Sequence, residues 1–197
     1  MPEQTLTVSW WWDWVPAAGG DTDERTAWTA ALSALLDGWA GDGTSAVLAA
    51  DLLARADQLA PHCRLVWGMG FLGDDIRWMP VIALVEFREA FPGDSAYLMG
   101  AVGAEGFADD VREPNVEYVS TRHGDGVRVI ALARTEENGL HGRVDAALRL
   151  ERATGDLDIL VTTRVNGLSR LAVIGDGIDA LLNVIADDSP ALAAGVL

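Results

Sequence analysis

One segment of the sequence matches a motif of known chemistry, the glycine-rich turn that holds the pyrophosphate of a dinucleotide. Residues 68–73 read G-M-G-F-L-G and follow a short apolar run. Such a turn binds phosphate where it opens a helix, because the amides and dipole of the helix N-terminus hold the negative charge. Here Asp74 and Asp75 follow instead, and then Pro80 and a β-branched run. We therefore expect these glycines to allow a bend or bulge in a hairpin, with no nucleotide bound.

The side chains that could ligate a metal or act as a nucleophile are scattered along the chain. The histidines His62, His123 and His141 have none of the spacings that place two ligands on one helical face. Cys63, the only cysteine, is next to His62, but adjacent residues of a strand point to opposite faces. No G-x-S-x-G elbow surrounds a serine, and the chain has no lysine for Schiff-base chemistry. The sequence therefore favours a protein without metal, cofactor or enzymatic activity.

An alternative stays open, in which an enzyme or small-ligand-binding site forms only in the tertiary structure. The residues around which such a site would form are Asp74, Asp75, Arg77 and His123. A closed pocket in which two of these side chains converge would favour this alternative, whereas a solid core would favour a non-catalytic protein.

The charge of the chain is strongly negative. Asp and Glu number 30 against 14 basic residues, all of them arginine, so that the formal net charge is −16 at pH 7. A field of this sign repels phosphate backbones and anionic lipids, and we expect neither nucleic acid nor membrane as a partner. Paired aspartates at 74–75, 109–110 and 187–188 lie beside breakers or in expected loops. We interpret all three pairs as solvated surface, because aspartate is rarely buried unless it is paired.

Four tryptophans near the N-terminus are the most unusual local feature. They are Trp10, Trp11, Trp12 and Trp14, and we predict that they bind a protein partner. In a strand, Trp10, Trp12 and Trp14 share one face, while Trp11 and Asp13 share the other. The first face can serve the core, and Trp11 is then either covered by a helix or exposed as a contact with another chain. A purely structural role and an aromatic platform for a ligand are the alternatives.

The elements that position these residues follow from hydrophobic periodicity and turn residues. Helical spacing predicts helices over residues 23–37, from residue 44 or 45 to before Pro61, and over residues 177–185. Alternating or β-rich runs predict strands at residues 5–14, 64–67, 81–87, 116–121, 127–133, 143–150 and 157–165. Early helices, late antiparallel hairpins and a closing helix indicate an α+β fold with a mostly antiparallel sheet packed by helices.

The length and composition indicate one folded unit. We expect residues 1–186 to form a single α+β domain and residues 187–197 to form a flexible C-terminal tail. The N-terminus lacks the basic flank and cleavage site of a signal peptide, and no apolar run reaches the roughly 20 residues that span a bilayer. A single cysteine fits a reducing compartment. The expected location is the cytoplasm.

The strand pattern of the C-terminal half carries a family resemblance. It consists of V-E-Y-V at 116–119, V-R-V-I at 127–130, L-D-I-L-V-T-T at 157–163 and a terminal helix over 177–185. This pattern resembles the PsbP-like α/β sandwich, which is shared by a photosystem extrinsic subunit, a Ran-binding nuclear import factor and the LpqN-like bacterial lipoproteins. The resemblance implies a non-catalytic scaffold that binds partner proteins. We therefore expect a protein–protein interaction or assembly factor of a bacterial system, with a protein partner or self-association.

Overall fold

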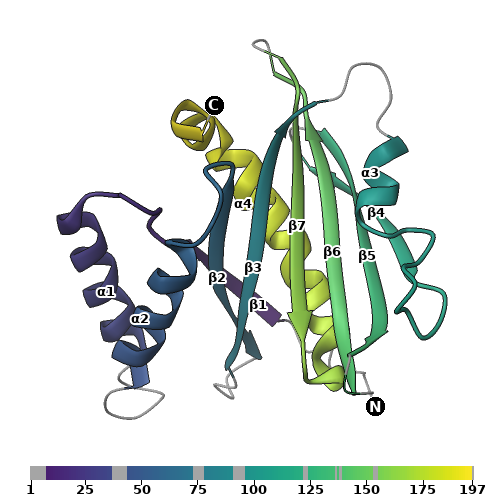
Figure 1. Ribbon diagram of the computed structural model, residues 1–197, viewed down its shortest axis with the longest axis horizontal. Helices are drawn as coiled ribbons and strands as arrows, with labels where there is room; N and C mark the ends of the chain where they lie inside the picture. The colour runs from purple at the N-terminus through teal and green to yellow at the C-terminus, as the bar shows by residue number, and fades with distance from the viewer. Residues whose placement is uncertain are drawn as a thin grey trace, which may run out of the picture.

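The chain folds into helices packed on one curled, antiparallel sheet. The computed structural model describes residues 8–36, 44–72, 78–90, 96–121, 124–135, 137, 139–152 and 155–196. Within these residues the sheet has seven strands in the order β1-β2-β3-β7-β6-β5-β4, and every neighbouring pair is antiparallel (Figure 1). The strands are β1 Val8–Trp14, β2 Cys63–Leu72, β3 Trp78–Glu89, β4 Asn115–Thr121, β5 Gly124–Arg134, β6 Leu140–Leu150 and β7 Leu157–Val165. The predicted α+β class is confirmed.

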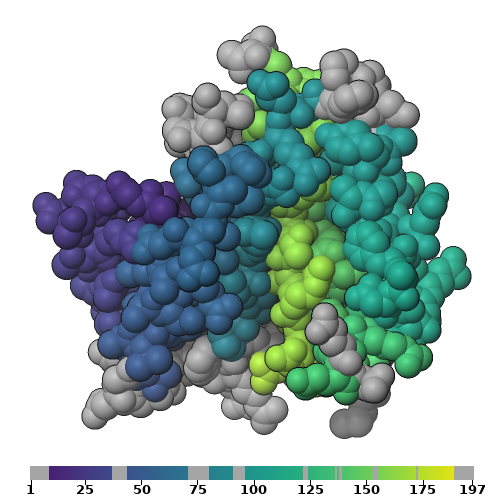
Figure 2. Space-filling model, in the orientation of Figure 1, coloured from purple at the N-terminus to yellow at the C-terminus, as the bar shows by residue number. Residues whose placement is uncertain are grey.

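The helices cover both faces of the sheet. They are α1 Thr22–Leu36, α2 Thr44–Ala56, α3 Ala96–Ala101 and α4 Leu171–Val196, with the 3₁₀ turn η1 Leu168–Arg170 before α4. Helix α4 crosses one face of the sheet, which we call the inner face; the opposite face is the outer face. Helices α1 and α2 lie at the β1–β2 end of the sheet, away from α3 (Figure 1). The purple and blue side chains of α1 and α2 stand out at one side of the molecule (Figure 2). The two later predicted hairpins, β4–β5 and β6–β7, are both present.

The main core lies between α4 and the inner face. The predicted apolar face of the closing helix is confirmed, because Ile178, Leu181, Leu182 and Ile185 are all fully buried. They pack on alternate residues of the strands, among them Val144 of β6, as period-two alternation requires. Burying one such side chain stabilises the fold by about 1.5–3 kcal/mol.

Helix α4 is longer than the sequence analysis predicted. It begins at Leu171 and continues to Val196, so that residues 187–196, expected as part of a flexible tail, are helical. The sequence analysis predicted a later start, at residue 177, because glycines such as Gly175 and Gly177 are unfavourable inside a helix. Its axis turns near the C-terminal end (Figure 1). No helix in the described part of the chain is long and apolar enough to cross a membrane.

A second core lies between α1, α2 and the outer face. Trp28 and Leu32 of α1 and Leu52 of α2 cover Trp67 and other outward residues of β2. Helix α1 begins after Asp21 because the Asp21 carboxylate accepts a hydrogen bond of 3.0 Å from the backbone N–H of Asp23. The outer face of β2 is thereby buried, so that β2 is apolar on both sides.

A third and smaller core lies under α3, which the sequence analysis missed. Leu98 of α3 and Val102 after it pack on Val127 and Val129 of β5. The helix has six residues, too few for an apolar repeat to show in the sequence.

Candidate functional site

Three of the four N-terminal tryptophans face the inner core. Trp10, Trp12 and Trp14 share one face of β1, as predicted, and the rings of Trp10 and Trp12 stack with centroids 5.6 Å apart. Trp12 Nε1 donates a hydrogen bond of 3.0 Å to the carbonyl of Gly177 in α4. Trp14 Nε1 donates one of 3.0 Å to a carboxylate oxygen of Asp188. These contacts fasten β1 to α4 from within the molecule.

Trp11 occupies the opposite face of β1. Its side chain is 37% exposed, and its ring meets that of Trp67 edge to face with centroids 5.4 Å apart. The Asp13 carboxylate, on the same face, accepts a hydrogen bond of 2.9 Å from Trp28 Nε1, and burial raises the pKa of Asp13. Of the four tryptophans predicted to bind a partner, Trp11 is therefore the one whose ring is free to do so in the folded chain.

Residues 68–72 of the glycine-rich motif lie inside a strand. Gly68 and Gly70 belong to β2, directly opposite Trp12 and Trp10, and β2 pairs next with β3 rather than leading into a helix. A Cβ on Gly68 would lie 2.3 Å from a ring atom of Trp12. Gly68 and Gly70 leave room for the tryptophan rings, and the continuous pairing of β2 shows no bend at residues 68–72, where the sequence analysis expected one.

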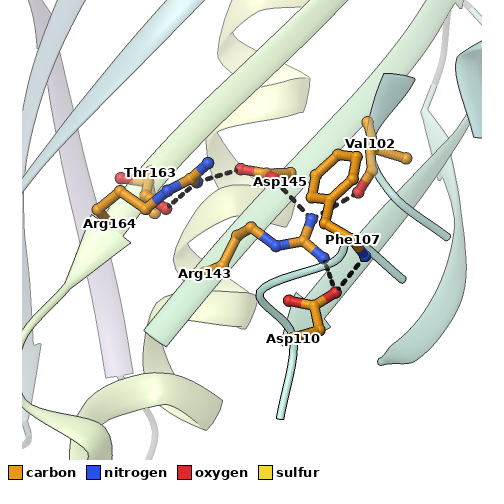
Figure 3. Close-up of polar contacts among 7 residues, drawn as sticks. All are labelled: Val102, Phe107, Asp110, Arg143, Asp145, Thr163 and Arg164. Carbon is orange, nitrogen blue, oxygen red and sulfur yellow. Dashed lines mark hydrogen bonds and ion pairs between the residues drawn. The ribbon is translucent and has the colours of Figure 1, made fainter. Parts of the chain in front are cut away.

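A buried ion network surrounds Arg143 on the outer face of β6 (Figure 3). Only 1% of the Arg143 side chain is exposed. Its guanidinium donates hydrogen bonds of 2.8 Å to Asp145, 2.7 Å to Asp110 and 2.7 Å to the carbonyl of Val102. Phe107 covers the guanidinium, with 4.3 Å between the Arg143 Cζ atom and the ring centroid. Burial opposes the charged form, but the hydrogen bonds to the two carboxylates raise the pKa of Arg143.

This network fastens the segment after α3 to the sheet. It overturns one interpretation, because the side chain of Asp110 is 4% exposed and paired with Arg143, not solvated. Asp110 also accepts a hydrogen bond of 2.8 Å from the backbone N–H of Phe107. Asp158, likewise fully buried, accepts two bonds of 2.7 and 2.9 Å from Arg149 and one from the Tyr97 hydroxyl of α3. These ion pairs and hydrogen bonds hold α3 and the segment after it against the sheet.

A different kind of ion cluster lies where α4 passes the edge strand β4. Arg128 of β5 is 5% exposed, and three carboxylates surround its guanidinium. Glu117 of β4 is in direct contact, while oxygens of Asp179 and Asp176 of α4 lie 3.1 and 3.7 Å from the guanidinium nitrogen Nη1. One positive charge faces three negative ones, so the cluster carries a formal excess of two negative charges at neutral pH.

The burial and the neighbouring negative charges change the pKa of Asp179. Burial raises the pKa of Asp179 to about 6, Arg128 lowers it, and the negative charges of Asp176 and Glu117 raise it further. Its buried Oδ1 atom has no hydrogen-bond donor among the described residues. Asp179 therefore ionises only as the pH approaches about 6, well above the ordinary range of an aspartate, and is held as a carboxylate at a cost at neutral pH.

We expect the substitution Asp179→Asn to stabilise the protein at pH 7.5 and to change little at pH 4. The folded chain binds the Asp179 proton more tightly than the unfolded chain, whose pKa is near the ordinary 3.8. Stability is thus lost as the pH rises from about 4 through about 6. Because Asp179 is partly exposed, solvent screening leaves a gain on the order of 1 kcal/mol at pH 7.5. Urea unfolding at both pH values measures it.

The matched control for this prediction is Asp176→Asn. The Asp176 side chain is mostly exposed, so we expect its stability change to stay within about 0.5 kcal/mol at both pH values. An Asp179→Asn protein with the parent's full loss of stability between pH 4 and pH 7 would contradict the assignment.

The described surface has several hollows. One of about 720 Å³ lies between the approach to β4, β5 and the start of α4, lined by Arg112, Glu113, Pro114, Asn115, Ile130, Ala131, Leu132, Leu168, Ser169 and Leu171. Another, of about 240 Å³, includes Cys63. Burial, and then Glu86, raise the pKa of the Cys63 thiol, which disfavours the nucleophilic thiolate. His62 faces Glu86, with 3.5 Å between Nε2 and Oε1.

The alternative site expected from the sequence lies outside the described residues. Its members Asp74, Asp75, Arg77 and His123 all fall there. Over the part of the chain that is described, no group of three or more His, Cys, Asp or Glu side chains has a geometry that could hold a metal ion. Comparison with protein-family models, with curated proteins and with solved structures finds no match to this chain.

Sequence reasoning missed the two arginine clusters. Arg143 and Asp145 stand two residues apart in β6, which places both charges on one face of the strand. Arg128 likewise interrupts the apolar run of β5. A charge that breaks the alternation of a predicted strand was the signal available in the sequence.

Proposed function

We propose that this chain is a non-catalytic protein–protein interaction or assembly protein of a bacterial cytoplasm, and that it binds its partner along the free edge of β4. The resemblance to the PsbP-like sandwich, whose members serve as scaffolds for partner proteins, points in the same direction. The observation that carries the proposal is the position of β4, which is the last strand of the sheet among the described residues and has side chains that are exposed or half-buried along its length.

The backbone of β4 offers hydrogen bonds to an added strand. Val111 N donates to Leu132 O at 2.7 Å, so the even-numbered residues of β5 turn their backbone groups toward the β4 side. Their partners Asn115, Glu117, Val119 and Thr121 are therefore the β4 residues bonded to β5. The alternate residues, Val116, Tyr118 and Ser120, turn their N–H and C=O groups away from the sheet. Such an edge is the template used in recognition by strand addition.

We expect the substitution Ser120→Pro to abolish partner binding while the domain stays folded. Proline removes an outward N–H and is tolerated at the solvent side of an edge strand. Affinity capture from the native host, compared by quantitative mass spectrometry, measures the proteins retained by each variant. Ser120→Ala is the control, because it loses the hydroxyl bond to Asp125 but keeps the backbone N–H.

A protein bound equally by the Ser120→Pro and Ser120→Ala variants does not use this edge. If every partner behaves in this way while urea unfolding shows both variants folded, strand addition at β4 is ruled out.

Trp11 is a second proposed contact, at the other end of the sheet. We expect Trp11→Ala to weaken capture of a partner and to lower the free energy of unfolding by about 2–3 kcal/mol, because both the covered part of the ring and its contact with Trp67 are lost. Trp12→Ala provides the contrast, because its ring is buried and its loss should cost about 3–5 kcal/mol. Unchanged capture by folded Trp11→Ala protein would remove Trp11 from the interface.

The hollow of about 720 Å³ supports one alternative, a domain that binds a small ligand. Its lining combines apolar side chains, among them Ile130, Leu168 and Leu171, with Arg112 and Glu113. A fluorescent long-chain carboxylate that binds the parent and is excluded by Leu171→Trp would favour this alternative. Strand addition is preferred because an unpaired, exposed strand edge specifies a mode of contact, which an open hollow does not.

A further inference from the structure

We infer that the segment accepted by β4 is basic, with lysine or arginine at every second position. This inference rests on the proposed function, since it names the chemistry of the partner at the same strand edge. The side chains of an added strand would alternate between the two faces of the sheet. We call the border of the inner face along β4 the inner rim and the border of the outer face the outer rim. Each rim therefore contacts every second residue of the partner strand.

Among the residues that the structure describes, the inner rim is short of positive charge. Glu117 projects from β4 toward Arg128, and Asp176 and Asp179 of α4 face the same guanidinium. Hydrogen bonding from Asn115, and then Arg128, lowers the pKa of Glu117, which is therefore ionised at neutral pH. The buried Arg128 balances one of the three carboxylates. A cationic side chain entering beside Glu117 would offset one of the two negative charges that the described residues leave unbalanced.

The outer rim offers an aromatic surface. Tyr118 lies opposite Val127 on the outer face and is 83% exposed, more than any other large hydrophobic side chain of the described residues. Its ring can pack against the apolar or aliphatic side chains of the partner's other row, and it can receive a cation over its face. A strand with alternating basic and apolar residues therefore satisfies both rims.

Charge also argues against a second copy of this chain on the edge. Each chain carries a formal charge of −16, and pairing β4 with itself would bring two Glu117–Asp176–Asp179 rims together. Like charges that face each other across strands are destabilising. The same negative field that would repel a second copy attracts a basic partner.

Synthetic, end-capped octapeptides provide the test. Four Lys–Val repeats are compared with four Thr–Val repeats, four Glu–Val repeats and a block peptide of four lysines followed by four valines. Isothermal titration measures affinity, and amide hydrogen exchange reports protection of Val116, Tyr118 and Ser120. We expect the Lys–Val peptide to protect these amides and to bind at least about tenfold more tightly than the Thr–Val peptide, with the Glu–Val peptide weaker still.

Charge variants of the protein sharpen the result. Glu117→Gln and Asp176→Asn should each weaken the Lys–Val peptide about threefold, whereas Asp51→Asn on α2 removes the same charge elsewhere and should change little. Equal affinity of the Thr–Val and Lys–Val peptides, with the β4 amides protected by both, would overturn the basic partner and leave strand addition standing. Protection by none of the peptides would overturn strand addition itself, and with it this inference. A block peptide that binds as tightly as Lys–Val, without protection, would likewise show diffuse attraction only.

Discussion

Replacing Arg143 by methionine should lower the free energy of unfolding by about 3–5 kcal/mol, the largest loss that we expect from any single charged residue of this chain. The reason is the burial of its partners. Asp110 loses the guanidinium that balances it, and the Val102 carbonyl loses a donor at 2.7 Å. An unpaired carboxylate in a dry site costs far more than an exposed ion pair contributes. Urea unfolding followed by tryptophan fluorescence measures the loss.

The matched control is Arg164→Met, which removes a guanidinium from the same network. Arg164 donates a hydrogen bond of 2.7 Å to Asp145, but its side chain is 44% exposed and water can replace it. We expect a cost below about 1 kcal/mol. Adding Asp110→Asn to Arg143→Met should recover part of the stability, because the buried negative charge is gone. A loss from Arg143→Met as small as that from Arg164→Met, below about 1 kcal/mol, would show that the buried contacts of Arg143 do not hold the fold.

Local rules predicted which side chains share a buried face of a strand or helix. Period-two alternation in the first strand placed Trp10, Trp12 and Trp14 on one face, and the structure has them there. Helical spacing identified the buried face of α4 from Ile178 to Ile185. Both features depend on neighbours within a few residues of each other, and such patterns are visible in one sequence.

Those local rules could not predict contacts between side chains that are far apart in the sequence. Asp110 and Arg143 are 33 residues apart, and only the register of β5 and β6 together with the position of α3 brings them into contact. The sequence shows an aspartate pair beside a loop, which is usually solvated. The cluster around Arg128 likewise draws on β4, β5 and α4, so no local window contains it. The exposed edge of β4 followed from the strand order, which the sequence analysis did not specify.

Substituting Gly68 by alanine should lower the free energy of unfolding by about 3 kcal/mol, although it adds one methyl group. The new Cβ would lie 2.3 Å from the Trp12 ring. That ring cannot move aside easily, because it stacks on Trp10 and its Nε1 is bonded to the carbonyl of Gly177. The absence of a side chain at Gly68 is therefore a packing requirement of the tryptophan strand. Thermal and urea unfolding measure the change.

Two comparisons separate this clash from a general effect of glycine. Gly100→Ala in α3 meets no atom within 4 Å and should stabilise the protein by about 0.5–1 kcal/mol, through the lower entropy of the unfolded chain. In a double-mutant cycle, Gly68→Ala combined with Trp12→Leu should cost at least about 1 kcal/mol less than the sum of the two single variants, because the smaller side chain makes room for the new methyl group. Additive losses would mean that Gly68 and Trp12 are not in contact, and that the tryptophans of β1 are held by α4 alone.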